Sequence, residues 1–134
     1  MIKRPYCLEA RLVEYVAPSF EPPHRVLLLV GAGPGRYQAE DAAARKRVIA
    51  RLQSFFDGWR DGGARLVGSF DDDYFVVGQP SSLGWSIFVL YEVPSLDLVV
   101  ERVNSTREEV DGERLDRAFR MEVRVGRSLF LLPD

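Results

Sequence analysis

Residues 85–103 read WSIFVLYEVPSLDLVVERV, and this segment contains two predicted elements in succession. Trp85–Val93 is rich in aromatic and β-branched residues, which indicates a strand. Ser95 follows Pro94 and is a good N-cap for a helix. The helix itself is predicted by apolar residues at positions i, i+3, i+4 and i+7, namely Leu96, Val99, Val100 and Val103. A strand therefore leads directly into an amphipathic helix.

A similar pair of elements lies N-terminal to this segment. The apolar run Val26–Val30 fits a strand that is covered on both faces. Ala39–Asp61 is the clearest helix of the chain, and Gly62-Gly63 supplies its stop. Its apolar residues recur at helical spacing, at Val48, Leu52, Phe55, Phe56 and Trp59.

Three further segments have the character of strands. Arg65–Phe70 and Tyr74–Gly78 are predicted strands, with Asp71-Asp72-Asp73 as the turn between them. From Leu115 to Val125 apolar residues alternate with mostly charged ones, which predicts a long amphipathic strand with Arg117 as the one exception. Leu129–Leu132 fits a terminal strand or a docked tail.

The first 24 residues form a separate region in the sequence. Tyr6–Val16 alternates at period two and is predicted as a strand, and a short helix over Glu9–Tyr15 is the competing interpretation. A proline-rich stretch then breaks regular structure. We therefore divide the chain into an N-terminal strand-like arm, residues 1–24, and one domain, residues 25–134.

The order of the elements predicts the fold class. Without the arm and the short Tyr74–Gly78 strand, the order is β-α-β-β-α-β, which is the ferredoxin-like plan. The predicted fold is therefore α+β, an antiparallel sheet with two helices on one face. Because the other face of such a sheet is left bare, we expect a homodimer.

Composition narrows the class of protein. The chain has 134 residues, of which 46% are hydrophobic and 28% are charged, an ordinary mix for one globular domain. Its net charge of −2 argues against nucleic-acid binding, which needs a basic surplus. No apolar run approaches the ~18 residues that span a bilayer, and no signal-peptide pattern follows the basic N-terminus. We expect a soluble cytoplasmic protein that binds neither nucleic acid nor membrane.

Metal, disulfide and phosphate sites find little support in the sequence. The single Cys7 excludes a disulfide within the chain, and the single His24 leaves no imidazole cluster for a metal. Gly31–Gly35 follows an apolar strand, as a dinucleotide fingerprint would. However, Arg36 stands where the last glycine belongs, and Pro34 removes an amide donor. We favour a flexible loop at a pocket rim over nucleotide or flavin binding, and we expect no cofactor and no metal.

Aromatic residues are the first candidates for a binding site. Most of them are expected in the core. Trp59, Phe88 and Tyr91 are the candidates to line an apolar pocket between sheet and helix, because apolar cavities with few polar groups are the usual small-molecule sites.

Polar candidates flank the predicted elements. Asn104 and Arg107 follow the second helix, and Arg107 would pair with a substrate carboxylate; helix C-capping and solvent exposure are the alternative. Asp72 and Asp73 would act as a catalytic base or orienting group, against the alternative of a solvated acidic turn.

The predicted order, the GSFDDD stretch at Gly68–Asp73 and the Trp-containing third strand resemble the dimeric α+β barrel superfamily. Within it, Asp97–Val100, Asn104, Arg107 and Val123–Phe130 resemble small bacterial proteins encoded beside genes for indole-acetic-acid and other aromatic catabolism.

This resemblance covers roughly residues 25–130 and implies a pocket for an aromatic or polyketide-like compound between sheet and helices. Members of the dimeric α+β barrel superfamily include cofactor-free monooxygenases, lactone isomerases, dehalogenases, haem-binding enzymes and proteins with no known activity. The His–Asp pair of the dehalogenase-like branch and a proximal haem histidine have no counterpart here.

The leading hypothesis is therefore a homodimer that binds a small aromatic or polyketide-like acid. It would serve aromatic metabolism as an accessory protein or as a cofactor-independent monooxygenase or isomerase, and the sequence leaves open whether it is an enzyme. The alternative is a non-enzymatic interaction subunit that docks a partner enzyme through its dimer face or its Arg-rich helix.

Overall fold

The computed structural model describes residues 21–33, 41–78, 84–129 and 131–132. The predicted N-terminal strand at Tyr6–Val16 lies outside the described residues. The described elements are β1 (His24–Ala32), α2 (Ala42–Asp61), β2 (Arg65–Asp71), β3 (Ile87–Val93), α3 (Leu96–Ser105), α4 (Leu115–Ala118) and β4 (Phe119–Gly126).

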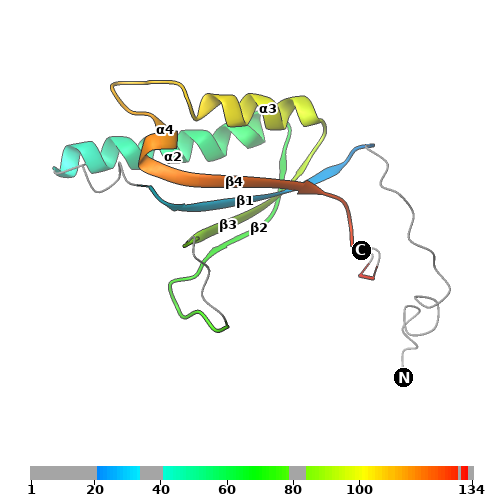
Figure 1. Ribbon diagram of the computed structural model, residues 1–134. Coiled ribbons are helices and arrows are strands. Elements are labelled where there is room, and N and C mark those ends of the chain that lie inside the picture. Colours follow the sequence, from blue (N-terminus) through cyan, green and yellow to red (C-terminus); the bar gives the residue numbers. More distant parts are fainter. Residues whose placement is uncertain (1–20, 34–40, 79–83, 130, 133–134) are drawn as a thin grey trace.

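The strands form one antiparallel sheet in the order β2-β3-β1-β4. The helices lie together on one face of this sheet (Figure 1). The chain is thus α+β with a four-stranded antiparallel sheet in its described part. This arrangement is consistent with the ferredoxin-like plan expected from the order of elements.

Helix α2 owes its position to capping and to its apolar stripe. The Asp41 side chain accepts a hydrogen bond from the Ala44 N–H at 2.6 Å and so satisfies a free donor of the first turn. The stripe that faces the sheet is buried and consists of Val48, Leu52, Phe55 and Trp59. This confirms the predicted helix, with its start at Ala42.

Two glycines let α2 approach α3 closely. A Cβ atom at Gly58 would overlap the guanidinium of Arg102, and one at Gly62 would overlap the Leu98 side chain. Gly58 and Gly62, four residues apart, therefore leave room on one side of α2 for the side chains of α3. Helix α3 begins as predicted, with the Ser95 hydroxyl accepting from the Leu98 N–H at 3.3 Å.

The sheet has one face covered by the helices and one face on which no described helix lies, which we call the open face. On β1 and β3 the side chains that face the helices are core residues: Val26, Leu28, Val30, Val89, Tyr91 and Val93. Successive side chains of a strand point to opposite faces, so the intervening Leu27, Phe88 and Leu90 lie on the open face. These three residues are half-buried.

Two sequence expectations need correction. The long strand over Leu115–Val125 is divided, because 115–118 form the short helix α4 and the strand begins at Phe119. Leu115 and Ala118 are buried at i and i+3, which explains why Arg117 broke the alternating pattern.

The second correction concerns a segment with local strand character. Residues 74–78 are not in a strand and stand exposed beside the sheet. Of the two alternatives at Leu129–Leu132, the structure excludes the terminal strand: Leu129, Leu131 and Leu132 are not in a strand, and the Leu132 N–H donates to the Leu129 carbonyl in a turn. Within the described residues, no helix combines the length and the apolar character needed to cross a membrane.

Candidate functional site

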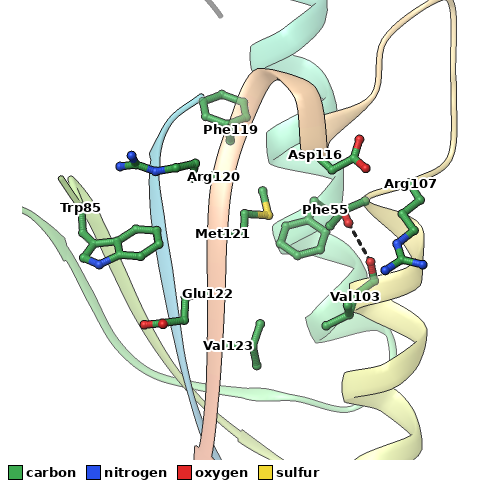
Figure 2. Close-up of a pocket in the computed structure, with 11 residues that line it drawn as sticks. Phe55, Trp85, Val103, Arg107, Asp116, Phe119, Arg120, Met121, Glu122 and Val123 are labelled. Carbon is green, nitrogen blue, oxygen red and sulfur yellow. Dashed lines mark hydrogen bonds between the residues drawn. The ribbon is translucent and has the colours of Figure 1, made fainter. Parts of the chain in front are cut away.

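A hollow of about 700 Å³ follows the edge strand β4 (Figure 2). We call it the β4 groove. Its lining comes from α2, from the strand β4, from α3 and α4 and from the segment before β3, and consists of Phe55, Trp85, Val103, Thr106, Arg107, Asp116, Phe119, Arg120, Met121, Glu122 and Val123.

The alternation of β4 gives the groove its two sides. Phe119, Met121 and Val123 point toward the helices, whereas Arg120 and Glu122 point to the open face of the sheet (Figure 2). Among the described strands β4 pairs with β1 alone, so the groove reaches both faces at this edge.

An apolar wall stands on the helix side of the groove. Phe55 of α2 is buried and faces β4, and Val103 of α3 completes the wall (Figure 2). Phe119 is also buried, and Met121 and Val123 pack against the core from β4. This side of the groove therefore offers an apolar surface suited to a ring or an alkyl group.

Arg107 supplies a cation at the rim of this wall. Its backbone N–H donates to the Asn104 carbonyl at 3.1 Å, which fixes the turn after α3. Its guanidinium makes no hydrogen bond and no ion pair with any residue that the structure describes. The five N–H donors of this side chain are consequently open to an anion.

The acidic side chains of the groove and its threonine hydroxyl each have a hydrogen-bond partner. Asp116 binds Arg114 through two hydrogen bonds, of 2.6 and 3.0 Å, and this partner raises the pKa of the exposed Arg114. Glu122 accepts a hydrogen bond from Arg124 at 3.0 Å. The Thr106 hydroxyl donates to the Val103 carbonyl at 2.7 Å. Arg107 is thus the available cation among the described lining residues.

Arg120 is held on the open-face side. Its guanidinium donates to the Gly84 carbonyl and lies 5.2 Å from the centre of the Trp85 ring. Gly31 makes this packing possible, because a Cβ atom there would overlap the Gly84 carbonyl oxygen. Gly31, the first glycine of the Gly31–Gly35 motif, therefore has a packing role in the described structure. The rest of that motif, from Pro34 on, lies outside the described residues.

A second hollow, of about 500 Å³, lies beside α2 and β2. Tyr91 reaches it from β3, and its hydroxyl donates to the Phe56 carbonyl at 3.2 Å. Burial raises the pKa of Tyr91; the nearby Arg60 lowers it and Asp57 raises it further. With its hydroxyl bonded to the main chain, Tyr91 has a structural role here.

The aromatic candidates from the sequence do not meet in one site. Trp59 is fully buried and stacks on Tyr91 in the core, and it lines neither hollow. Phe88 lies on the open face, where its ring stacks on that of Phe70 with centroids 4.7 Å apart. Contact of these residues with a ligand stays a prediction.

The polar candidates are also dispersed. Arg107 lines the β4 groove, and Asn104 beside it is exposed and holds Arg107 through its carbonyl. Asp72 and Asp73 line neither hollow. The Asp72 N–H donates to the Ser86 carbonyl at 3.1 Å, and the Asp73 N–H donates to Asp71 Oδ1 at 3.3 Å.

Sequence reasoning missed the apolar wall of the groove. Phe55 was assigned to the core, and Met121 and Val123 were recognised only as one face of a strand. The alternation was visible, but the edge position of the strand depends on pairing with β1, which the sequence pattern does not show.

The described part of the chain has no group of three or more His, Cys, Asp or Glu residues arranged to hold a metal ion. No protein-family model matches the chain, and the search of curated proteins finds no match.

Proposed function

We propose that this protein binds a small ring compound with a carboxylate group in the β4 groove. The ring would lie against Phe55, Phe119 and Met121, and the carboxylate would pair with Arg107. The observation that carries the proposal is a guanidinium, at the rim of an apolar wall, that no described side chain engages.

The size and chemistry of the groove support such a ligand. Its volume of about 700 Å³ lies within the ~300–1,000 Å³ typical of small-molecule sites. Arginine binds carboxylates through two parallel N–H···O bonds, which orients the ligand as well as holding it. Apolar burial contributes ~25 cal/mol per Å² of ring surface removed from water.

A binding or accessory role in aromatic metabolism fits the groove better than catalysis. A general acid or base needs a side chain that is free to exchange a proton with the substrate. The two carboxylates of the lining, Asp116 and Glu122, are each bonded to an arginine. Asp72 and Asp73 lie outside the groove.

We propose further that the protein acts as a homodimer through the open face of its sheet. This face presents Leu27, Phe88 and Leu90 away from the helix layer, and Phe70 at its edge is 63% exposed. Apolar side chains gathered on an uncovered sheet face favour association.

The binding proposal is tested by isothermal titration calorimetry with benzoate and indole-3-acetate. We expect both to bind the wild type, and Arg107→Gln to weaken them by ~10-fold, the size of a charge-assisted pair at a partly exposed site. Lys46→Gln is the matched control, because Lys46 is exposed on α2 and lines neither hollow.

Neutral analogues separate the two halves of the site. Benzamide should bind the wild type and Arg107→Gln equally, whereas Met121→Ala should weaken the acid and the amide alike. Equal affinity of Arg107→Gln and wild type for benzoate would overturn the assignment of the carboxylate. Absence of binding by every ring acid would overturn the proposed function.

A further inference from the structure

Residues 74–77 form an apolar segment that has no packing partner in the described structure. We call it the apolar arm, or simply the arm; it is distinct from the N-terminal region of residues 1–24. Tyr74, Phe75, Val76 and Val77 are between 71% and 99% exposed. Among the described residues, they make no hydrogen bond through backbone or side chain. The segment leaves β2 on the side of the sheet away from the helices (Figure 1). Four successive large apolar side chains in water indicate a surface that is covered in the functional state.

The open face of the sheet has a matching apolar centre. Leu27 is paired in register with Leu90, and Phe88 is paired with Leu29 on one side and Phe70 on the other. Leu29 is already buried, at 5% exposure, whereas Leu27, Phe88 and Leu90 are half-buried and Phe70 is exposed. We call these last four side chains the apolar patch.

Two of the arginines beside the patch are paired with carboxylates. Arg65 contacts Glu92 at 3.3 Å, and Arg124 contacts Glu122 at 3.0 Å. A polyanion such as nucleic acid would have to compete with these carboxylates for the arginines. The surface therefore fits an apolar protein segment better than a charged partner.

We propose that the arm of one copy packs on the apolar patch of a second copy, and the reverse. This inference rests on the proposed homodimer and specifies what seals it. The arm and the patch belong to the same chain and lie on the same side of the sheet. A two-fold pair therefore satisfies both surfaces at once, as isologous interfaces do.

The area of the open face shows why the arm is needed. Four strands ~4.8 Å apart and ~7 residues long, at ~3.4 Å per residue, present a face of roughly 450 Å². A stable interface buries ~800 Å² on each partner. Tyr74 and Phe75 would bury ~150–250 Å² each, which brings each copy to about that size.

The arm is tested by sedimentation equilibrium over a range of protein concentrations. We expect a wild-type dimer, and a dissociation constant at least ~100-fold higher for Tyr74→Ser/Phe75→Ser, since buried aromatic anchors dominate such interfaces. Ile49→Ser/Val100→Ser is the matched control, because these residues are 54% and 58% exposed on the helix layer. The control should remain a dimer.

The arm variant should still fold, because its residues contact little in the single chain. Its circular dichroism and its benzoate affinity should match the wild type, which separates this inference from the binding proposal. In a mixture of labelled and unlabelled protein, isotope-filtered NOEs should connect the Phe75 ring with the Leu27 and Leu90 methyl groups of the other copy.

Three results would overturn the inference. In the first, Tyr74→Ser/Phe75→Ser dimerises as tightly as the wild type, whereas Leu90→Asp is monomeric. The homodimer would then form through the open face without the arm. The second is a wild type that is monomeric at all concentrations, which would remove the homodimer as well. The third is a monomer that sediments with phosphatidylcholine vesicles, which would assign the arm to a lipid surface.

Discussion

The rings of Trp59 and Tyr91 stack nearly parallel, with centroids 5.2 Å apart and planes 14° from one another. One ring belongs to α2 and the other to β3, so this contact joins the longest helix to the centre of the sheet. The Phe55 ring lies edge-on to the Trp59 indole, with their centroids 6.1 Å apart. The two residues that the sequence suggests as ligand contacts are thus also central to the core.

Trp59→Ala should destabilise the protein by ~3–5 kcal/mol, because it empties a fully buried site. Urea unfolding followed by far-ultraviolet circular dichroism measures this loss. Trp85→Ala is the matched control, since Trp85 is only half-buried and should cost clearly less. Equal losses for the two variants would contradict the central role of Trp59.

Tyr91→Phe should lower the free energy of unfolding by ~0.5–1.5 kcal/mol at neutral pH, because the hydrogen bond to the Phe56 carbonyl is lost.

Tyr91 should also make stability depend on alkaline pH. Burial raises its pKa in the folded protein above the ordinary value of about 10. The unfolded chain therefore loses this proton first as the pH rises. The contribution of Tyr91 is complete below about pH 10 and is lost as the pH rises through the folded-state pKa. Urea unfolding across this range should show a smaller decline for Tyr91→Phe. Parallel declines would contradict the assignment.

Gly58→Ala should have opposite effects in two backgrounds. Alanine favours a helix over glycine by ~0.8–1 kcal/mol, but its Cβ would overlap the Arg102 guanidinium. Displacing this side chain is costly because Arg102 is largely buried against α2. We expect Gly58→Ala to destabilise the wild type and to stabilise the Arg102→Ala variant. A double-mutant cycle should give a coupling of ~1 kcal/mol or more; no coupling would refute the close approach.

Gly31→Ala and Gly126→Ala test the packing of the loop before β3. A methyl group at Gly31 would overlap the Gly84 backbone carbonyl, which cannot move aside as a flexible side chain can. We expect a loss of ~1–3 kcal/mol, the usual cost of overpacking. Gly126 has no heavy atom within 4 Å of an added Cβ, so its variant should be near neutral. Thermal unfolding of both variants measures the difference.

Most element positions could be predicted because their signals are local. The helical spacing within α2 and the N-cap at Ser95 are readable from a few neighbouring residues, and the structure confirms both. Arg117 was the sign that the last predicted strand was too long. A helical turn and an alternating strand place apolar residues similarly over so short a segment, so the pattern alone favoured the longer element.

The strand prediction at Tyr74–Gly78 failed for a non-local reason. The segment has strand-forming residues, but a strand needs a neighbour to pair with, and β3 pairs with β2 and β1 instead. The same residues then stand exposed as the apolar arm. Local propensity identified an apolar segment correctly and could not tell whether a partner strand was within reach.

The sequence by itself determined the α+β class and the order of the four strands and the two long helices, because periodicity and capping act over a few residues. Only the tertiary structure decided that β4 lies at the edge of the described sheet, and that Phe55, Arg107 and Met121 line one groove. These residues are far apart in the chain. Strand pairing and helix packing bring them together, and both depend on contacts between distant segments that no local pattern specifies.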